Sequence, residues 1–131
     1  FMEYSNLIKE AVKARENSYS PYSNFKVGAA VLGKSGKVYT GANIENASYG
    51  ASICAERVAC TRAIFEGEKE ILAVAIVGSK EGALCYPCGI CRQFLCEFGN
   101  PDIVLSKSGE VDKILKLSEL IPNSFTSSDM D

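Results

Sequence analysis

The sequence predicts an α/β fold in which a mixed sheet of about five strands lies between two layers of helices. Helix-like and strand-like segments follow one another in the order α-β-β-α-β-α-β-β, and this alternation favours a sheet with helices on both faces. The segment 71–77 is continuously apolar, which is typical of a strand buried on both faces, as in a parallel sheet. A length of 131 residues fits one compact domain.

The N-terminal third is expected to form a helix followed by a hairpin. Apolar residues recur at helical spacing over 4–17. The turn-forming segment 18–24 ends this helix. Strand-like stretches follow at 25–32 and 38–42, and the glycines and polar residues of 33–37 between them are typical of a hairpin turn.

The second half is expected to supply the remaining helices and strands. After a polar loop, Ser52 is the expected N-cap of a helix, because a serine hydroxyl can accept a hydrogen bond from the first helical turn. The elements expected from there on are helices over 53–65 and 89–98, strands over 71–77, 103–105 and 111–115, and at most one helical turn at 118–120.

The composition excludes several classes of protein. With 47% hydrophobic and 23% charged residues the chain is globular rather than disordered. A net charge of −2 and scattered basic residues argue against nucleic acid as a partner. No apolar run reaches the roughly 18 residues of a membrane span, and no signal peptide is expected. The domain is expected to cover 2–131, with Phe1 interpreted as an addition ahead of Met2.

Six cysteines and no histidine restrict the chemistry that the chain can perform. Without His, acid–base catalysis near neutral pH needs a perturbed Glu, Asp, Cys or Lys. Cys88 and Cys91 form a C-x-x-C pair at the start of an expected helix. Residues i and i+3 share a helix face, so both sulfurs can reach one metal ion. The N-terminus of a helix also favours the thiolate form that binds metals.

Cys54 lies at the start of another expected helix. If the two helix N-termini converge, three thiolates meet and leave a fourth position open, as a catalytic zinc site requires. Glu56 follows two residues later and therefore does not share a helix face with Cys54. Its carboxylate is better placed to act on a water molecule beside the open position than to serve as a fourth ligand.

A C-x-x-C pair by itself leaves other functions open. It also occurs in redox pairs and in structural zinc sites, for which Cys60, Cys85 or Cys96 could supply a fourth thiolate. The sequence Cys54-Ala55-Glu56, together with a proline directly before Cys88, favours catalysis, because the zinc deaminase signature has a three-cysteine form with this pattern. Cys60 and Cys96 are otherwise expected to be small buried hydrophobes.

Four ordered motifs resemble those of the small homotetrameric cytidine deaminases, and the resemblance covers almost the whole chain. The motifs are SPYSNFKVGAA at 20–30, GANIENASYG at 41–50, CAER at 54–57 and PCGICRQ at 87–93. The resemblance implies a cytidine deaminase-like fold. It also implies zinc-dependent hydrolysis of cytidine and 2′-deoxycytidine to uridine and 2′-deoxyuridine, with release of ammonia, as in pyrimidine salvage. It further implies one Zn²⁺ per subunit, a homotetramer with sites at subunit interfaces, and a cytoplasmic location.

The resemblance assigns the metal ligands and the groups that hold the base. Cys54, Cys88 and Cys91 would bind the zinc ion. Glu56 would carry protons from the attacking water to N3 of the ring and to the leaving amine. Phe25 would pack on the pyrimidine, where an aromatic face supplies stacking energy.

The resemblance also assigns further contacts to the base and to the ribose. The backbone N–H of Ala55 would read the amide edge of the base. Asn43 and Glu45, which alternation places on one side of an extended segment, would bind the ribose hydroxyls. Tyr49 and Phe125 would belong to the sugar pocket, in part across subunits.

Arg57 is expected to offset charge at the metal. Three thiolates on Zn²⁺ leave a charge of −1, which weakens the Lewis acidity of the ion. A guanidinium beside the sulfurs would offset that charge.

Two other functions compete with this interpretation. A non-enzymatic zinc module would need a fourth protein ligand and would leave Glu56 without a role. A related enzyme could act on another aminated heterocycle or on a polynucleotide. Low basicity argues against the polynucleotide, and Glu45 would repel a phosphate, so a free nucleoside is the expected substrate.

Overall fold

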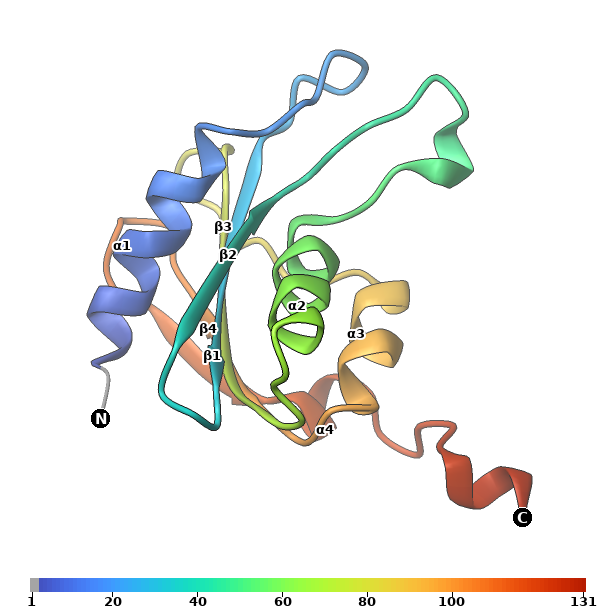
Figure 1. Cartoon of the computed structure of the whole chain (residues 1–131). Coiled ribbons are helices and arrows are strands. Elements are labelled where there is room, and N and C mark those ends of the chain that lie inside the picture. Colours follow the sequence, from blue (N-terminus) through green and yellow to red (C-terminus); the bar gives the residue numbers. More distant parts are fainter. Residues whose placement is uncertain (1–2) are drawn as a thin grey trace.

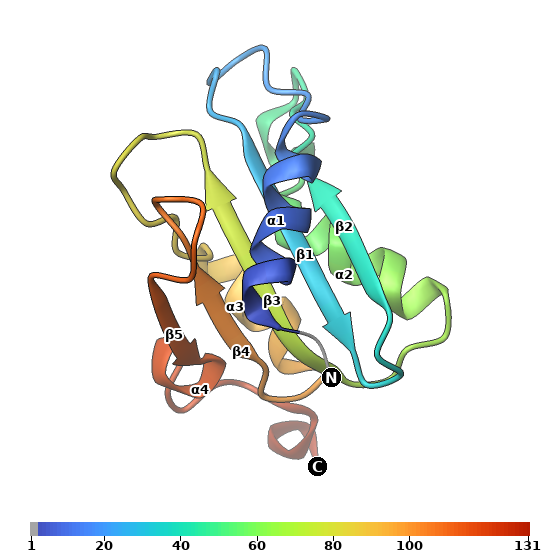
Figure 2. The same ribbon diagram turned by 90° about the vertical axis from the view of Figure 1, so that its left-hand side faces the viewer.

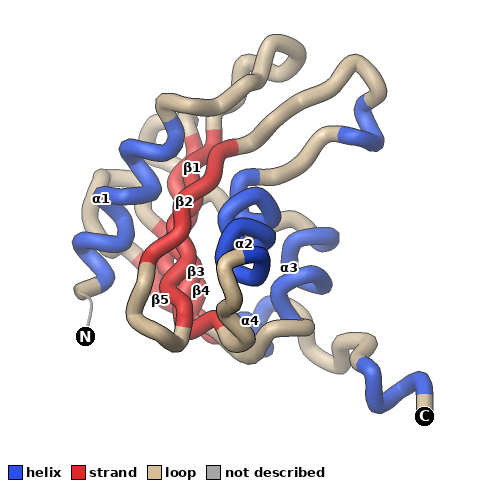
Figure 3. Tube along the Cα trace, viewed as in Figure 1, coloured by secondary structure: helices blue, strands red, loops and turns tan. Residues whose placement is uncertain are grey.

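A five-stranded mixed sheet with the strand order β2-β1-β3-β4-β5 forms the centre of the molecule (Figures 1 and 3). The computed structural model describes residues 3–131, so the interpretation of Phe1 lies outside the described residues. The strands are β1 (Val27–Gly33), β2 (Val38–Ala42), β3 (Ile71–Gly78), β4 (Asp102–Leu105) and β5 (Lys113–Lys116). The predicted mixed sheet of about five strands is confirmed.

The middle strand β3 determines the mixed character of the sheet. It pairs antiparallel with β1 and parallel with β4, while β1–β2 and β4–β5 are antiparallel pairs. Every residue of β3 except Leu72 is buried. The predicted burial on both faces is therefore confirmed, although the sheet is parallel only on the β4 side. The chain passes from β3 to β4 through a helix, as a parallel pair requires.

Helices cover both faces of the sheet, so the predicted three-layer arrangement is confirmed (Figures 1 and 2). Helix α1 (Tyr4–Arg15) lies on one face. The other face carries α2 (Ala55–Phe65) and α3 (Gly89–Cys96), followed by the short α4 (Leu117–Leu120). Within residues 3–131, none of the helices has the length and apolar character needed to cross a membrane.

Two apolar cores lie on the two sides of the sheet. Alternate residues of β3 belong to different cores, because successive side chains of a strand point to opposite faces. Ala73 and Ala75 pack toward α1 with Leu7. Val74 and Ile76 pack toward α2 and α3 in a second cluster. The continuous apolar run of β3 therefore serves both cores.

The start of α2 differs from the prediction. Ser52 is not its N-cap, because Ile53 forms an isolated antiparallel bridge with Ile44 through two backbone hydrogen bonds of 2.9 Å. The Ser52 hydroxyl instead accepts a hydrogen bond from the Asn46 backbone N–H. The extended backbone therefore continues to Cys54, which is the N-cap residue.

Smaller differences from the prediction occur at the ends of other helices and strands. Helix α1 ends at Arg15 rather than 17, and α3 ends at Cys96 rather than 98. Strand β1 begins at Val27 rather than 25, because side chains bind both backbone groups of Phe25: its N–H donates to Ser23 Oγ and its carbonyl accepts from Asn43 Nδ2. Two short 3₁₀ helices, Tyr49–Ala51 and Ser127–Met130, were not expected.

Glycine allows α1 to lie directly against β1. A Cβ atom added at Gly28 would lie 2.0 Å from the Ala11 carbonyl oxygen and 2.6 Å from the Arg15 backbone nitrogen. Both neighbours are backbone atoms of α1, which cannot move without displacing the helix. The contact between α1 and the sheet therefore depends on the absence of a side chain at this position.

The substitution Gly28→Ala is expected to destabilise the fold by about 1–3 kcal/mol or more, because α1 must shift away from β1. Urea unfolding followed by far-ultraviolet circular dichroism measures this loss. Gly50→Ala is the matched control, since a Cβ at Gly50 meets no atom within 4 Å. Equal stability of the two variants would contradict the packing argument.

Candidate metal centre

The N-termini of α2 and α3 bring three cysteines together. Cys54 and Cys88 are the N-cap residues of the two helices, and Cys91 lies in the first turn of α3. The Sγ atoms of Cys54 and Cys88 are 3.6 Å apart, as are those of Cys88 and Cys91. All three sulfurs lie within 4.8 Å of one another. The convergence of two helix N-termini expected from the sequence is thus present.

The spacing of the sulfurs fits zinc. Tetrahedral coordination with Zn–S bonds of about 2.3 Å separates neighbouring sulfurs by about 3.8 Å. Among residues 3–131 no fourth cysteine, aspartate or glutamate joins the group. Cys60 and Cys96 instead pack in the core beneath α2 and α3. The three thiols therefore form a zinc site that leaves a coordination position for a non-protein ligand.

Cys54 is placed where its thiolate is favoured, whereas Cys91 holds its proton. The pKa of Cys54 is lowered to about 5, chiefly by a hydrogen bond from the Cys91 thiol and also by Arg57. The pKa of Cys91 is raised in turn, because it donates to the Cys54 sulfur and is buried. The positive end of a helix dipole adds to the stabilisation of negative sulfur at both N-caps.

Glu56 is a buried carboxyl group beside the sulfurs. It lies in the first turn of α2, directly after Ala55, and only 4% of its surface is exposed. Burial raises its pKa to about 7, and the negative charge of Cys54 contributes in the same direction. A carboxyl group with this pKa can both accept and release a proton near neutral pH.

Arg57 contacts the cysteine sulfurs from the same helix turn. Its Nη2 atom donates to Cys54 Sγ at 3.6 Å. Burial opposes the charge of the guanidinium, yet hydrogen bonds to Cys54 and Cys91 outweigh this, and the pKa of Arg57 is raised. Its Nε atom is buried and has no hydrogen-bond partner among the described residues. The predicted position of a cation beside the thiolates matches this geometry.

Phe25, Asn43 and Glu45 come together at the ends of β1 and β2. The Asn43 amide donates to the Phe25 carbonyl at 2.8 Å and accepts from the Val27 N–H at 2.9 Å. Its oxygen also accepts from Ser18 Oγ at 2.5 Å. Asn43 thus holds the backbone from the Phe25 carbonyl to the Val27 N–H, a positioning role that the sequence did not indicate.

Glu45 is held by the turn that precedes Phe25. Its carboxylate accepts hydrogen bonds from the N–H groups of Tyr22 and Ser23, at 2.9 and 3.1 Å, and from the Ser23 hydroxyl. These hydrogen bonds, that from the Ser23 hydroxyl first, lower the pKa of Glu45. Glu45 therefore carries a fixed negative charge at neutral pH.

Tyr49 shares a hollow with Glu45, whereas Phe125 does not. The hollow has a volume of about 240 Å³ and is lined by Glu45, Tyr22 and Tyr49, among others. The Phe125 carbonyl accepts a hydrogen bond from Gln93 of α3. Figures 1 and 2 place the C-terminal segment at the opposite end of the molecule from the loop at 43–52. Within one chain, these two aromatic residues cannot line the same pocket.

Sequence reasoning missed two serines near the site and gave Cys85 no role beyond a possible fourth thiolate. Ser18 and Ser23 bind Asn43 and Glu45, and only the turn chemistry of 18–24 could have indicated them. Cys85 packs beside Phe25: a Cβ added at Gly78 would lie 2.9 Å from Phe25 Cζ and 3.0 Å from Cys85 Cβ. Burial, followed by the nearby charges of Glu56 and the cysteines, raises the pKa of Cys85 to about 11. It remains a neutral thiol next to the metal site.

Known proteins resemble this chain in sequence. The family model described as the cytidine and deoxycytidylate deaminase zinc-binding region matches residues 2–107. A cytidine deaminase of Halalkalibacterium halodurans is 46% identical over 133 residues, which cover 99% of each chain. A cytidine deaminase of Mycobacterium tuberculosis is 36% identical over 129 residues, which cover 98% of this chain and 94% of the relative.

Solved structures resemble this chain in fold. The crystal structure of a cytidine deaminase from Burkholderia pseudomallei has a TM-score of 0.88 and 43% sequence identity, covering 95% of this chain and all (100%) of the other. The enzyme from Mycobacterium tuberculosis gives a TM-score of 0.83 at 36% identity, with 96% and 99% of the two chains covered. Both likenesses extend over nearly the full length of this chain.

Replacing Arg57 by alanine is expected to weaken zinc binding by about 10- to 100-fold, the usual effect of removing a group that hydrogen-bonds to metal ligands. Competition with a chromophoric zinc chelator measures the affinity. Arg62→Ala is the control, because Arg62 lies on the same helix but donates to the Thr40 carbonyl. If Arg57→Ala held zinc as tightly as Arg62→Ala, a role for Arg57 at the thiolates would be ruled out.

Proposed function

The chain belongs to the cytidine deaminase family, and from that premise we propose that it hydrolyses cytidine and 2′-deoxycytidine to uridine and 2′-deoxyuridine with release of ammonia. The observation that carries this proposal is the buried carboxyl group of Glu56 beside three convergent thiols. When bound, zinc supplies the Lewis acidity that makes a water molecule nucleophilic near neutral pH.

Glu56 is the proposed proton carrier. Its carboxylate takes a proton from the attacking water and delivers it to N3 of the ring, which makes C4 electrophilic. The same carboxyl group then moves the hydroxyl proton to the departing amine. A pKa raised to about 7 by burial supports this role, because the group must gain and lose a proton two times in one turnover.

Phe25 and Ala55 are the proposed contacts of the pyrimidine. The Phe25 side chain is 37% exposed, and the missing side chain at Gly78 gives its ring room at the end of β3. An exposed aromatic face can stack on a flat base. Ala55 is fully buried at the first turn of α2, and its backbone N–H is the proposed donor to the O2 edge, with Glu56 at N3.

Asn43 and Glu45 are the proposed partners of the ribose. The fixed carboxylate of Glu45 can accept hydrogen bonds from sugar hydroxyls. Asn43 already uses its oxygen and one N–H within the protein, so it retains a single N–H for the substrate. The negative charge of Glu45 favours an uncharged nucleoside over a nucleotide.

Arg57 is the proposed counter-charge of the site. With zinc bound, the three thiolates leave a net charge of −1, which a guanidinium beside them reduces to zero. Its contact with Cys54 supports this role.

A homotetramer is proposed as the working form. Tyr49 belongs to the loop at 43–52 and Phe125 to the C-terminal segment, and these two segments lie at opposite ends of the molecule (Figure 1), so a pocket that contains both residues requires a neighbouring subunit. Large apolar side chains exposed at the surface support such an interface: Tyr22, Tyr49, Ile53, Ile90 and Phe125. A cytoplasmic location fits a chain in which all six cysteines are free thiols.

Ammonia release from a panel of substrates tests the function. The zinc-loaded chain is expected to deaminate cytidine and 2′-deoxycytidine and to act far more slowly on CMP, cytosine and adenosine. Slow turnover of CMP follows from repulsion between its phosphate and Glu45. Preference for adenosine, for free cytosine or for CMP would overturn the proposed substrate class.

The substitution Glu56→Gln is expected to leave the zinc content unchanged and to lower turnover by about 100- to 10,000-fold, because the proton carrier is lost. Steady-state kinetics and metal analysis measure the two quantities. Glu66→Gln, an exposed position that caps the same helix, is the matched control and should retain activity. Near-normal turnover by Glu56→Gln would exclude the proposed mechanism.

A further inference from the structure

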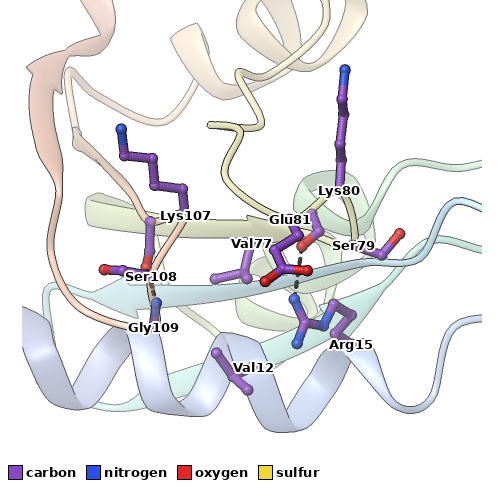
Figure 4. Close-up of a pocket in the computed structure, with 11 residues that line it drawn as sticks. Val12, Arg15, Val77, Ser79, Lys80, Glu81, Lys107, Ser108 and Gly109 are labelled. Atoms are coloured by element: carbon purple, nitrogen blue, oxygen red, sulfur yellow. Dashed lines mark hydrogen bonds between the residues drawn. The ribbon is translucent and has the colours of Figure 1, made fainter.

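A second hollow lies beside α1 (Figure 4). It is on the opposite face of the sheet from α2 and α3, at whose N-termini the cysteines lie (Figure 1). Its volume is about 280 Å³. Val12 and Arg15 of α1 form one wall, Val77 at the end of β3 contributes apolar surface, and the loops that follow β3 and β4 form the rest. No residue of the proposed deaminase site lines it.

The topology creates this hollow. Because β3 and β4 are parallel, their carboxyl ends meet at the same edge of the sheet. The loop at 79–88 leaves toward α3, where its residues Leu84 and Cys85 pack against the core on that side. The loop at 106–112 turns toward α1, where Val111 packs against the other core. A crevice between loops that leave neighbouring strand ends in this way is a common ligand site in α/β proteins.

The hollow is positively charged in a chain that is negative overall. Arg15, Lys80 and Lys107 line it from three different elements, and Glu81 is the one acidic residue among the described lining residues. The chain as a whole carries a net charge of −2. Within residues 3–131 none of the three cations has a carboxylate within 4.0 Å. The Arg15 Nη1 atom donates to the Gly78 carbonyl at 2.7 Å, which fixes the guanidinium at the base of the hollow.

The wall formed by the loop at 106–112 is ordered by its own hydrogen bonds. Asp112 accepts from the backbone N–H groups of Lys107 and Ser108, at 2.7 and 3.1 Å, and from the Ser108 hydroxyl. The Gly109 N–H donates to Ser106 Oγ at 2.9 Å, the contact dashed at the left of Figure 4. The Asp112 carboxylate is thus occupied by hydrogen bonds within its own loop. The Lys80 and Lys107 side chains, in contrast, extend freely from their loops (Figure 4).

We propose that this hollow binds a small sugar phosphate. Cations from three elements suit a phosphate dianion. The Glu81 carboxylate can accept hydrogen bonds from sugar hydroxyls, and Val12 and Val77 can pack against the carbon chain. The volume lies near the lower end of the range of about 300–1,000 Å³ for small-molecule sites, which favours one sugar over a dinucleotide.

Titration of the ¹⁵N-labelled, zinc-loaded chain with ribose 5-phosphate, inorganic phosphate and ribose tests the proposal at constant ionic strength. Ribose 5-phosphate is expected to shift the amide signals of 79–81 and 107–109 saturably and to bind at least tenfold more tightly than inorganic phosphate. Ribose alone should cause no saturable shift. Equal affinity for the two phosphates would overturn the sugar requirement in favour of a simple phosphate site, and shifts confined to 43–57 would overturn the location.

A pair of double variants separates the site from general charge effects. Lys80→Gln with Lys107→Gln is expected to weaken binding of ribose 5-phosphate at least tenfold, because both cations at the rim are lost. Lys9→Gln with Lys69→Gln removes the same charge at exposed positions outside the hollow and should leave the affinity unchanged. Equal weakening by the two pairs, or none by the first, would refute the proposal. All four lysines are exposed, so the thermal unfolding midpoints should match the unsubstituted chain.

Discussion

The convergence of two helix N-termini on one point is the constraint on which the rest of the site depends. Cys54 and Cys88 supply two sulfurs only because α2 and α3 begin at those residues and pack side by side on one face of the sheet. Helix α2 is held there by a close approach to β2: a Cβ at Gly41 would lie 2.5 Å from the Ala59 backbone nitrogen. The position of the sulfurs is therefore set by backbone packing in the body of the domain, and a flexible loop is not needed to assemble them.

The same geometry explains the balance of charge at the metal. Two helix dipoles and the Arg57 guanidinium favour thiolates at a place where three sulfurs crowd together. Glu56 lies in the same helix turn, yet burial acts on it in the opposite sense and raises its pKa to about 7. Two neighbouring groups at the start of α2 are thus driven to opposite protonation behaviour: the Cys54 thiol toward the anion and the Glu56 carboxyl group toward the neutral acid. The metal ligands and the proposed proton carrier therefore come from the four consecutive residues 54–57 and the start of α3.

The sequence predicted the features that depend on local pattern and missed those that depend on tertiary contacts. The C-x-x-C spacing, the apolar run of β3 and the turn at 33–37 all appear as expected, because each depends on residues close together in the chain. Ser52 was a wrong choice of N-cap because a bridge between Ile44 and Ile53 extends the strand-like backbone past it, and no local pattern reports that bridge. The hydrogen bonds of the Asn43 side chain, which support the backbone from Phe25 to Val27, join residues 16 to 25 positions apart in the chain. The identity of the substrate came from the motifs that the chain shares with a family, and no spacing of cysteines could have supplied it.

The loop at 79–88 connects the two faces of the molecule. Lys80 and Glu81 line the hollow beside α1, while Cys85 packs near Phe25 and Cys88 is a metal ligand on the opposite face. A ligand in the hollow that favours one arrangement of Lys80 and Glu81 therefore also influences the position of Cys88, the metal ligand at the other end of the same loop. Thermodynamic linkage makes such an effect reciprocal, so substrate or zinc that favours one arrangement of the loop changes the affinity of the hollow by the same factor. Such coupling requires that the loop has at least two arrangements and that each ligand binds them with different affinity. The Ser79 hydroxyl accepts a hydrogen bond from the Lys26 N–H, but within 79–84 no side chain binds a backbone group of the same loop, as Asp112 does in the facing loop at 106–112. The loop after β3 is therefore the part of the domain through which the two sites can communicate.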